Sequence, residues 1–85
     1  MDVKVLGPGC AKCKTLYEAT DKAIKQLGLT ATLTKIEKIN EIAAFKVLMT
    51  PALVINGEVK AAGRLPSTAE LTTWLSTAAT SKEPG

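Results

Sequence analysis

Two short β-rich segments, residues 2–6 and 30–36, flank a stretch with helical periodicity, and this order limits the possible folds more than any other feature of the sequence. Strands that are connected through a helix of this length pair in parallel, with a right-handed crossover. Gly28 fits the position that ends the helix, because glycine readily adopts the left-handed conformation found there. The side chains that recur on one helical face are Cys13, Leu16, Tyr17, Thr20, Ala23, Ile24 and Leu27. The first half of the chain therefore predicts a β-α-β unit.

A second and shorter helix is predicted after this unit. Asn40 has a side chain suited to capping it, and we expect the helix to extend to Phe45 or Val47. Ile42 and Phe45 are expected to face inward. Thr50-Pro51 then interrupts the pattern, because the residue before a proline disfavours the helical conformation.

Two further strands and a last helix follow. The segments ALVI and EVKAA flank Asn56-Gly57, a pair that favours a type I′ hairpin turn because both central residues of that turn need positive φ. Ser67 and Glu70 form a capping-box pattern at the start of the last helix. The apolar face of that helix comprises Leu71, Trp74, Leu75 and Ala78. The chain is thus predicted to be an α/β protein of order β-α-β-α-β-β-α, parallel in its first half and antiparallel in its second.

Length and composition indicate one domain without a membrane segment. With 85 residues, 46% of them hydrophobic, the chain can bury one modest core, which we assign to residues 1–79, with residues 80–85 as a frayed tail. No apolar run reaches the roughly 18 residues that a membrane span needs, and the first residues lack the pattern of a signal peptide. We therefore expect a cytoplasmic, monomeric protein.

The net charge of +3 and the pI of about 9.0 raise the question of nucleic-acid binding. The lysines of the first half, however, alternate with acidic residues, and the chain contains one Trp, one Tyr and one Phe. Surfaces that follow a nucleic-acid backbone typically combine clustered cations with several stacking rings. We therefore expect no nucleic-acid partner.

The two cysteines of the chain stand three residues apart at the start of the predicted first helix. Positions i and i+3 share a helical face, so Cys10 and Cys13 can form a reversible disulfide. Cys10 precedes the first turn, where free N–H groups and the helix dipole favour a thiolate, and Lys12 and Lys14 add positive charge. Cys13 belongs to the apolar face, and we expect it to be more buried. This asymmetry predicts thiol–disulfide exchange, with Cys10 as the attacking nucleophile and Cys13 as the resolving thiol.

Two other interpretations of the cysteine pair remain open on the residues alone. A closed zinc site needs about four ligands, whereas the chain has no histidine and only two cysteines. Cu(I) accepts two thiolates, so a carrier of Cu(I) or another soft metal is the alternative function. The cysteines can also be simple packing residues, because free cysteines are often buried. In a cytoplasmic protein, a CxxC pair beside a β-α-β pattern favours redox exchange, with no cofactor other than the disulfide itself.

Residues outside the pair add a family resemblance. The opening strand-Gly-Pro-Gly-Cys10-x-x-Cys13-helix, the later segment TPALVING and Gly63 together resemble the thioredoxin/glutaredoxin superfamily. The chain is most similar to the small thioredoxin-like, or redox-active disulfide, proteins of bacteria and archaea, and the likeness extends from about Val3 to Leu75. The resemblance implies a four-stranded mixed sheet in the order 2-1-3-4, flanked by three helices.

The resemblance also implies roles for individual residues. Pro51 corresponds to the cis-proline that faces the cysteines, and the backbone of Thr50 is expected to pair with the substrate chain around its disulfide. Gly63 is expected to keep the rim of the fourth strand open near the disulfide. Ala11 and Lys12, which separate the cysteines, are expected to contact the substrate, and Lys12 to influence the choice of partner.

The chain departs from the familiar members of the superfamily in three respects. Ala11-Lys12 replaces the Gly-Pro of ordinary thioredoxins and the Pro-Tyr of glutaredoxins, Gly9 replaces a tryptophan, and no acidic residue in an interior strand supplies a buried carboxylate. These departures leave the redox potential open. We expect the chain to reduce disulfide-containing protein substrates and to take electrons from a reductase such as thioredoxin reductase. A ferredoxin-linked enzyme and glutathione are alternative electron donors.

Overall fold

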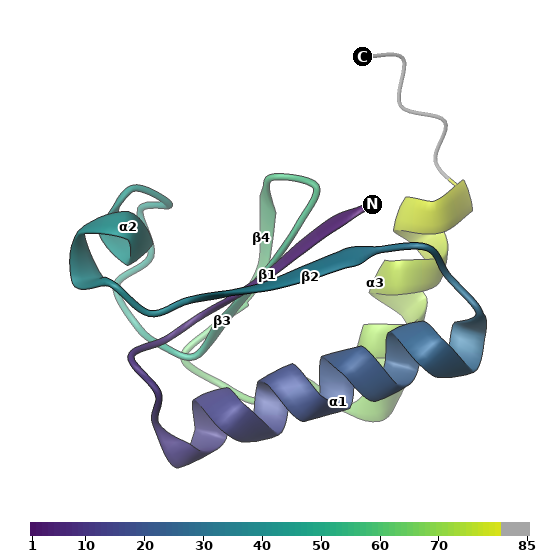
Figure 1. Ribbon diagram of the computed structural model, residues 1–85, viewed down its shortest axis with the longest axis horizontal. Helices are drawn as coiled ribbons and strands as arrows, with labels where there is room; N and C mark the ends of the chain where they lie inside the picture. The colour runs from purple at the N-terminus through teal and green to yellow at the C-terminus, as the bar shows by residue number, and fades with distance from the viewer. Residues whose placement is uncertain (81–85) are drawn as a thin grey trace.

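The computed structural model describes residues 1–80, in which three helices pack on a four-stranded sheet (Figure 1). The elements in chain order are β1 (Asp2–Leu6), α1 (Ala11–Leu27), β2 (Thr32–Ile36), α2 (Ile39–Ala43), β3 (Ala52–Ile55), β4 (Glu58–Ala62) and α3 (Thr68–Thr80). The strand order is β2-β1-β3-β4; β1 pairs in parallel with β2, and β3 pairs antiparallel with both β1 and β4. The predicted fold class, element order and strand order are confirmed. The tail expected from residue 80 lies, beyond Thr80 itself, outside the described residues.

The helices cover the two faces of the sheet unequally: α1 and α3 lie on one face and α2 on the other (Figure 1). The main core on the α1 and α3 side consists of Val3, Val5, Leu16, Ala23, Ile24, Leu53, Ile55, Leu71 and Leu75. On the opposite face, Ile42 of α2 packs against Leu6, Ala52 and Val54. Complete burial of a large aliphatic side chain contributes about 1.5–3 kcal/mol. The two clusters therefore hold β1, whose end leads to the cysteines, firmly between α1 and α2.

Helix α1 begins and ends where the sequence indicates. Cys10 is its N-cap residue, with extended backbone angles (φ −70°, ψ 166°). At the other end Gly28 adopts the left-handed conformation (φ 67°) and its N–H donates to the carbonyl oxygen of Lys25 at 3.1 Å. The buried face comprises Cys13, Leu16, Thr20, Ala23 and Ile24. Neither α1 nor any other helix within residues 1–80 is long and apolar enough to cross a membrane.

The start of β2 and the start of α2 differ from the sequence predictions. β2 begins at Thr32 rather than at residue 30, because its pairing with β1 starts at Asp2↔Thr32. α2 begins at Ile39, after the extended residue Lys38, and its start has no side-chain cap. The prediction that Asn40 caps this helix is therefore wrong, since Asn40 lies inside it.

The end of α2 also differs from the prediction. The helix ends at Ala43 instead of Phe45 or Val47. Lys46 adopts a left-handed backbone conformation (φ 61°), which no α-helix can continue through. Phe45 and Val47 still pack, partly buried, against the cluster on this face of the sheet. The inward position of Phe45 thus comes from a turn and not from a helix.

The turn and cap signals in the second half of the chain are confirmed. Asn56 (φ 50°) and Gly57 (φ 82°) both have positive φ in the β3–β4 hairpin. The side chain of Asn56 also accepts a hydrogen bond from the N–H of Asp2 at 2.9 Å. At the start of α3, the N–H of Ser67 donates to the Glu70 carboxylate (2.9 Å) and the N–H of Glu70 donates to the Ser67 hydroxyl (3.1 Å). This reciprocal pair is the capping box.

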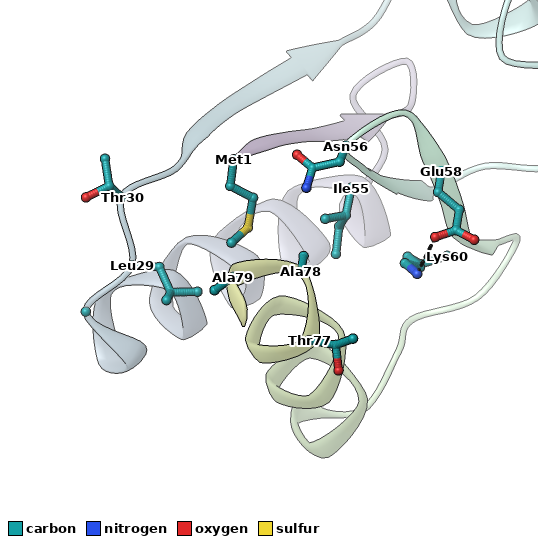
Figure 2. A pocket seen from close by; sticks show the side chains of 11 residues that line it. Met1, Leu29, Thr30, Ile55, Asn56, Glu58, Lys60, Thr77, Ala78 and Ala79 are labelled. Carbon is teal, nitrogen blue, oxygen red and sulfur yellow. Dashed lines mark hydrogen bonds and ion pairs between the residues drawn. The ribbon is translucent and has the colours of Figure 1, made fainter. Parts of the chain in front are cut away.

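A hollow of about 900 Å³ lies at the hairpin end of the sheet (Figure 2). Its wall combines Met1, the connection between α1 and β2, the β3–β4 hairpin and the last turns of α3. Glu58 and Lys60 form an ion pair in this wall. The cysteines lie elsewhere, because β1 carries the chain to the opposite end of the sheet before α1 begins.

Candidate active site

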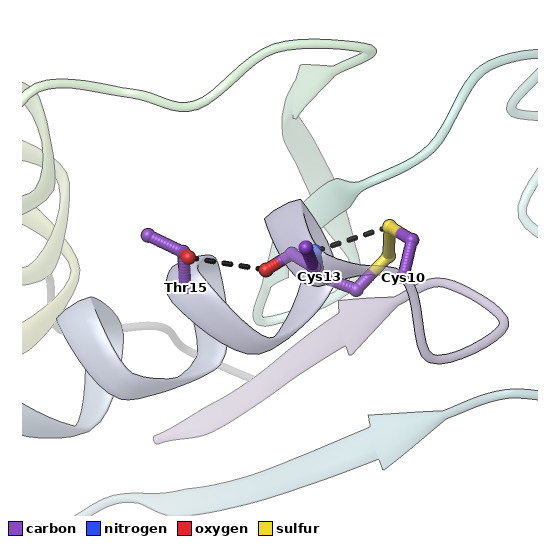
Figure 3. Close-up of a disulfide and its surroundings, with 4 residues drawn as sticks. Cys10, Cys13 and Thr15 are labelled. Carbon is purple, nitrogen blue, oxygen red and sulfur yellow. Dashed lines mark hydrogen bonds between the residues drawn. A yellow bond between two sulfur atoms is a disulfide. The ribbon is translucent and has the colours of Figure 1, made fainter.

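Cys10 and Cys13 form a disulfide at the N-terminus of α1 (Figure 3). Their Cα atoms are 5.0 Å apart, within the range in which a disulfide forms without movement of the backbone. The N–H of Cys13 points at the Sγ of Cys10 at 3.2 Å. Free N–H groups and the positive end of the helix dipole thus surround the position at which a Cys10 thiolate would carry its charge.

The two cysteines differ sharply in exposure. Cys10 is exposed at the start of the helix, whereas the side chain of Cys13 is 5% exposed and lies on the buried face of α1. A partner can therefore reach Cys10 from solvent, whereas the buried Cys13 takes part in exchange by way of Cys10. This is the difference in burial that the helical periodicity predicts.

Gly7 lies directly against the buried sulfur. A Cβ atom at this position would overlap the Sγ of Cys13 and would lie 3.9 Å from the Cα of Pro51. The N–H of Gly7 also donates to the carbonyl oxygen of Ile36 at 2.8 Å, which ties it to the end of β2. The absence of a side chain at residue 7 therefore lets β1, the disulfide and Pro51 come together. In the sequence Gly7 stands out only as part of the Gly-Pro-Gly stretch before Cys10, and this contact was not predicted.

The segment before β3 also comes close to Gly7. The Thr50–Pro51 peptide bond is cis, and Pro51 is fully buried. The carbonyl oxygen of Pro51 accepts a hydrogen bond from the N–H of Gly63 at 2.9 Å, which joins this segment to the end of β4. Pro51 and the sulfur of Cys13 thus both lie close to Gly7, and a backbone hydrogen bond joins Pro51 to Gly63.

Met49 occupies the space in front of Gly63. A Cβ atom on Gly63 would lie 2.9 Å from the Cβ of Met49 and 3.2 Å from both its Sδ and its Cε. Gly63 also has a positive φ of 80°, which favours glycine independently. The space that we expected to form an open rim at Gly63 is therefore filled by the Met49 side chain, a residue that sequence reasoning did not single out.

Charged side chains surround the start of α1. Ala11, Lys12 and Lys14 are exposed, and the first turn of α1 contains no acidic residue. One carboxylate comes from the residue that follows β2: the Oε2 of Glu37 lies 3.4 Å from the position that a Cβ on Gly9 would take. Cations therefore predominate beside Cys10, with Glu37 as a neighbouring acidic group that the sequence did not indicate.

Comparison with known proteins agrees with this geometry. Residues 1–76 match the family model of the thioredoxin domain. The chain belongs to the thioredoxin family. It is 35% identical over 69 residues to a thioredoxin of Methanocaldococcus jannaschii, which covers 81% of this chain and 79% of the relative. It is 34% identical over 71 residues to a thioredoxin of Methanothermobacter thermautotrophicus, which covers 84% of this chain and 92% of the relative.

Family membership and the CxxC disulfide together support one general activity. A thioredoxin-family chain whose two cysteines form a disulfide at the start of α1 is a thiol–disulfide oxidoreductase. The resemblance that the sequence suggested is thereby confirmed at the level of the superfamily.

Arg64 follows Gly63 but is held by α3. Its guanidinium donates two hydrogen bonds to the Glu70 carboxylate, both at 2.9 Å, and lies 5.9 Å from the centre of the Trp74 ring. The hydrogen bonds from Arg64, followed by that from the N–H of Ser67, lower the pKa of Glu70 from its ordinary 4.5 to about 2. In this thioredoxin-family chain, the pair fastens the loop after β4 to the start of the last helix.

The alternative of a soft-metal site concerns the two thiols. Within residues 1–80, no group of three or more His, Cys, Asp or Glu side chains is arranged to hold a metal ion. The Cu(I) alternative is therefore built on the thiols of Cys10 and Cys13, and a Cu(I) titration of the reduced thioredoxin-family chain tests it directly.

Proposed function

We propose that this chain reduces disulfides in protein substrates through a reversible Cys10–Cys13 dithiol/disulfide couple. The observation that carries the proposal is the unequal exposure of the two sulfurs in one disulfide, with Cys10 open to solvent and Cys13 buried. An exposed attacking thiol with a buried neighbour one helical turn away suits a two-step exchange. The proposal includes a cytoplasmic location and action as a monomer.

The exchange begins from the reduced dithiol. The Cys10 thiolate attacks one sulfur of the substrate disulfide, the substrate S–S bond breaks, and the leaving substrate thiolate takes up a proton. The Cys13 thiol then loses its proton and attacks the Cys10 sulfur of the mixed disulfide, which releases the second substrate thiol. The substrate gains two electrons and two protons, and the chain ends as the Cys10–Cys13 disulfide.

The site has features that support stabilisation of the Cys10 thiolate. The N–H of Cys13 already points at the Cys10 sulfur, and Lys12 and Lys14 stand in the exposed first turn. Both features lower the free energy of a negative sulfur relative to its protonated form. These interactions act on the first step, because in the second step Cys13 attacks the Cys10 sulfur and the substrate thiolate is the group that leaves.

Contact with the substrate is assigned to the residues around the disulfide. We propose that the backbone of Thr50 pairs with the substrate chain next to its cystine, as an added strand, while Ala11, Lys12 and Gly63 border the contact. The position of Pro51 beside Gly7 and Cys13 supports this assignment, because it brings Thr50 to the same end of the sheet as the disulfide. A reductase such as thioredoxin reductase is the proposed source of electrons.

Two cysteine substitutions test the mechanism. We expect Cys10→Ser to abolish dithiol-dependent reduction of a protein disulfide, because the buried Cys13 cannot be reached by a substrate. Cys13→Ser is expected to accumulate a mixed disulfide between Cys10 and the substrate, since no second thiol resolves it. The measurements are a reduction assay with dithiothreitol as the electron donor and mass spectrometry of the trapped adduct. Retention of reductase activity by Cys10→Ser would overturn the assigned roles.

A further inference from the structure

The Glu37 carboxylate is a charged group beside the disulfide that has no part in the exchange described above. Glu37 follows β2, and its Oε2 lies 3.4 Å from the position that a Cβ on Gly9 would take. Gly9 comes directly before Cys10 and has no side chain to keep the carboxylate away. The negative charge of Glu37 therefore lies next to the backbone that leads into the nucleophile.

The pairing of β1 with β2 holds this carboxylate near Cys10. The two strands run in parallel and end together at the pair Leu6↔Ile36. Beyond this pair, the N–H of Gly7 donates to the carbonyl oxygen of Ile36 at 2.8 Å. The loop before Cys10 is thus fastened to the residue before Glu37, so the closeness of Glu37 to Cys10 follows from the sheet itself.

The charge of Glu37 is not neutralised by a neighbour. Its side chain is exposed and, among residues 1–80, forms no ion pair or hydrogen bond. The Glu70 carboxylate, by contrast, accepts two hydrogen bonds of 2.9 Å from Arg64. Opposite charges in contact cancel most of their effect on more distant groups, whereas an unpaired carboxylate keeps its full effect. Glu37 is therefore able to act on the Cys10 sulfur through its charge.

Cations predominate among the other charged groups at this end of the sheet. The charged side chains on the neighbouring segments are Lys12, Lys14, Lys38, Glu41, Lys46, Arg64 and Glu70. Arg64 and Glu70 pair with each other, and residues 47–51, which lead into β3, carry no charge. The cations next to Cys10 favour its thiolate, so the charge of Glu37 acts against them.

A negative charge at this position affects the reduced and the oxidised chain unequally. The disulfide carries no charge, whereas the reduced chain carries one on Cys10 whenever its thiol loses the proton. Repulsion by Glu37 raises the free energy of this thiolate and leaves the free energy of the disulfide nearly unchanged. A couple whose reduced form is stabilised is a strong oxidant, and a couple whose reduced form is destabilised is a better reductant.

We propose that the unpaired carboxylate of Glu37 destabilises the reduced form of the Cys10–Cys13 couple and thereby shifts this couple toward electron donation. The inference rests on the proposed function, because it gives a reason why the chain reduces disulfides in its substrates and does not form them. Lys12 and Lys14 favour a reactive sulfur, and Glu37 limits how far they stabilise the reduced form. Glu37 is exposed and follows the edge strand β2, so this role differs from that of a buried carboxylate that exchanges protons with the cysteines.

Glu37→Gln tests the inference, because it removes the charge and keeps the size of the side chain. Two quantities are measured: the midpoint pH of the thiolate absorbance in the reduced chain, and the equilibrium constant for reduction of glutathione disulfide by that chain. Glu18→Gln is the matched control, since Glu18 is exposed and lies about 12 Å along α1 from Cys10. This distance exceeds the Debye length of about 10 Å at 0.1 M salt.

We expect Glu37→Gln to lower the midpoint of the thiolate titration by about half a pH unit, which is about a threefold change in the proton equilibrium. The equilibrium constant at pH 8 is expected to fall by about threefold, because the thiolate form of the variant is more stable. At pH 5 the thiol is protonated and the two chains are expected to agree. Glu18→Gln is expected to match the wild-type chain in both measurements.

An unchanged midpoint or an unchanged equilibrium constant at pH 8 in Glu37→Gln would overturn the inference and leave the proposed function in place. A difference that stayed equally large at pH 5 or in 1 M salt, where the Debye length is about 3 Å, would have a structural cause and would also overturn it. Failure of the wild-type chain to reduce any protein disulfide would overturn the proposed function. The thiolate titration needs no protein substrate, so the two failures are distinguishable.

Discussion

At the scale of single residues, Gly7 lies against the sulfur of the buried Cys13. Its Cα lies so near Cys13 and Pro51 that a methyl group has no room while the disulfide is intact. In the reduced chain the Cys13 thiol is free to rotate, so the same methyl group is easier to accommodate. Gly7 therefore couples the packing of β1 to the oxidation state of the cysteines.

Gly7→Ala is expected to lower the free energy of unfolding of the oxidised chain by about 1–3 kcal/mol, the usual cost of overfilling a packed site. The reduced chain is expected to lose less, because its Sγ can rotate away and the remaining contact, with the Cβ of Cys13 at 3.1 Å, requires only a small shift. Urea denaturation of both forms measures the two losses, and the reduced form serves as the control. Equal losses in the two forms would contradict the assigned contact.

Lys12 is expected to affect the reactivity of Cys10 through its positive charge. We expect Lys12→Glu to raise the pKa of Cys10 and to slow its attack on disulfides near neutral pH, because a carboxylate disfavours the thiolate. The pKa is measured by titration of the thiolate absorbance in the reduced chain. Lys22→Glu is the matched control, since it makes the same change of charge about 15 Å along α1, which is beyond the Debye length of about 10 Å at 0.1 M salt. A titration curve unchanged by Lys12→Glu would count against this role.

At the scale of helices and strands, the start of α3 depends on the Glu70 carboxylate, which makes two kinds of interaction. Glu70 completes the capping box with Ser67 and holds Arg64, so the helix start and the loop after β4 are fixed together. The pKa of Glu70 in the folded chain, about 2, lies below its ordinary value of 4.5. A carboxylate with a lowered pKa stabilises the fold above its unfolded pKa, and this stabilisation is lost as pH falls toward the folded pKa.

We therefore expect the stability of the wild-type chain to fall as pH is lowered from about 4.5 to about 2. Glu70→Gln is expected to flatten this part of the profile, since it removes the group that titrates. Urea midpoints measured across this range test the expectation, with Glu18→Gln on α1 as a control of equal charge change. Salt should reduce the difference, because the pair is exposed and therefore screened. Parallel profiles for the wild-type chain and Glu70→Gln would refute the assignment.

Some helices and turns of this fold can be predicted from the sequence, whereas the end of α2 cannot. The first helix, the hairpin and the capping box are marked by residues a few positions apart, and their signals agree with one another. The end of α2 is different: Lys46 takes a left-handed conformation that its side chain does not favour. Packing of Phe45 and Val47 against the sheet decides this boundary, and local propensity contains no information about it.

At the scale of the whole molecule, the site divides into a predictable and an unpredictable part. The cysteines and their helix position follow from a short motif. The contacts of Gly7 with Pro51 and of Met49 with Gly63 join residues far apart in the sequence, so they depend on how β1, β3 and β4 assemble. A periodic pattern indicates which face of an element is buried, but it does not identify the residue that lies opposite.

The strand arrangement also separates the two ends of the molecule. The Asn56–Gly57 turn lies at one end of β3, and the disulfide lies beyond the other end, with the whole central strand between them. A fluorescent label or a surface tether attached at that turn would leave the sulfurs free to meet their substrates. The hairpin is therefore a suitable attachment point for immobilising this oxidoreductase on a sensor or an electrode while it continues to exchange electrons.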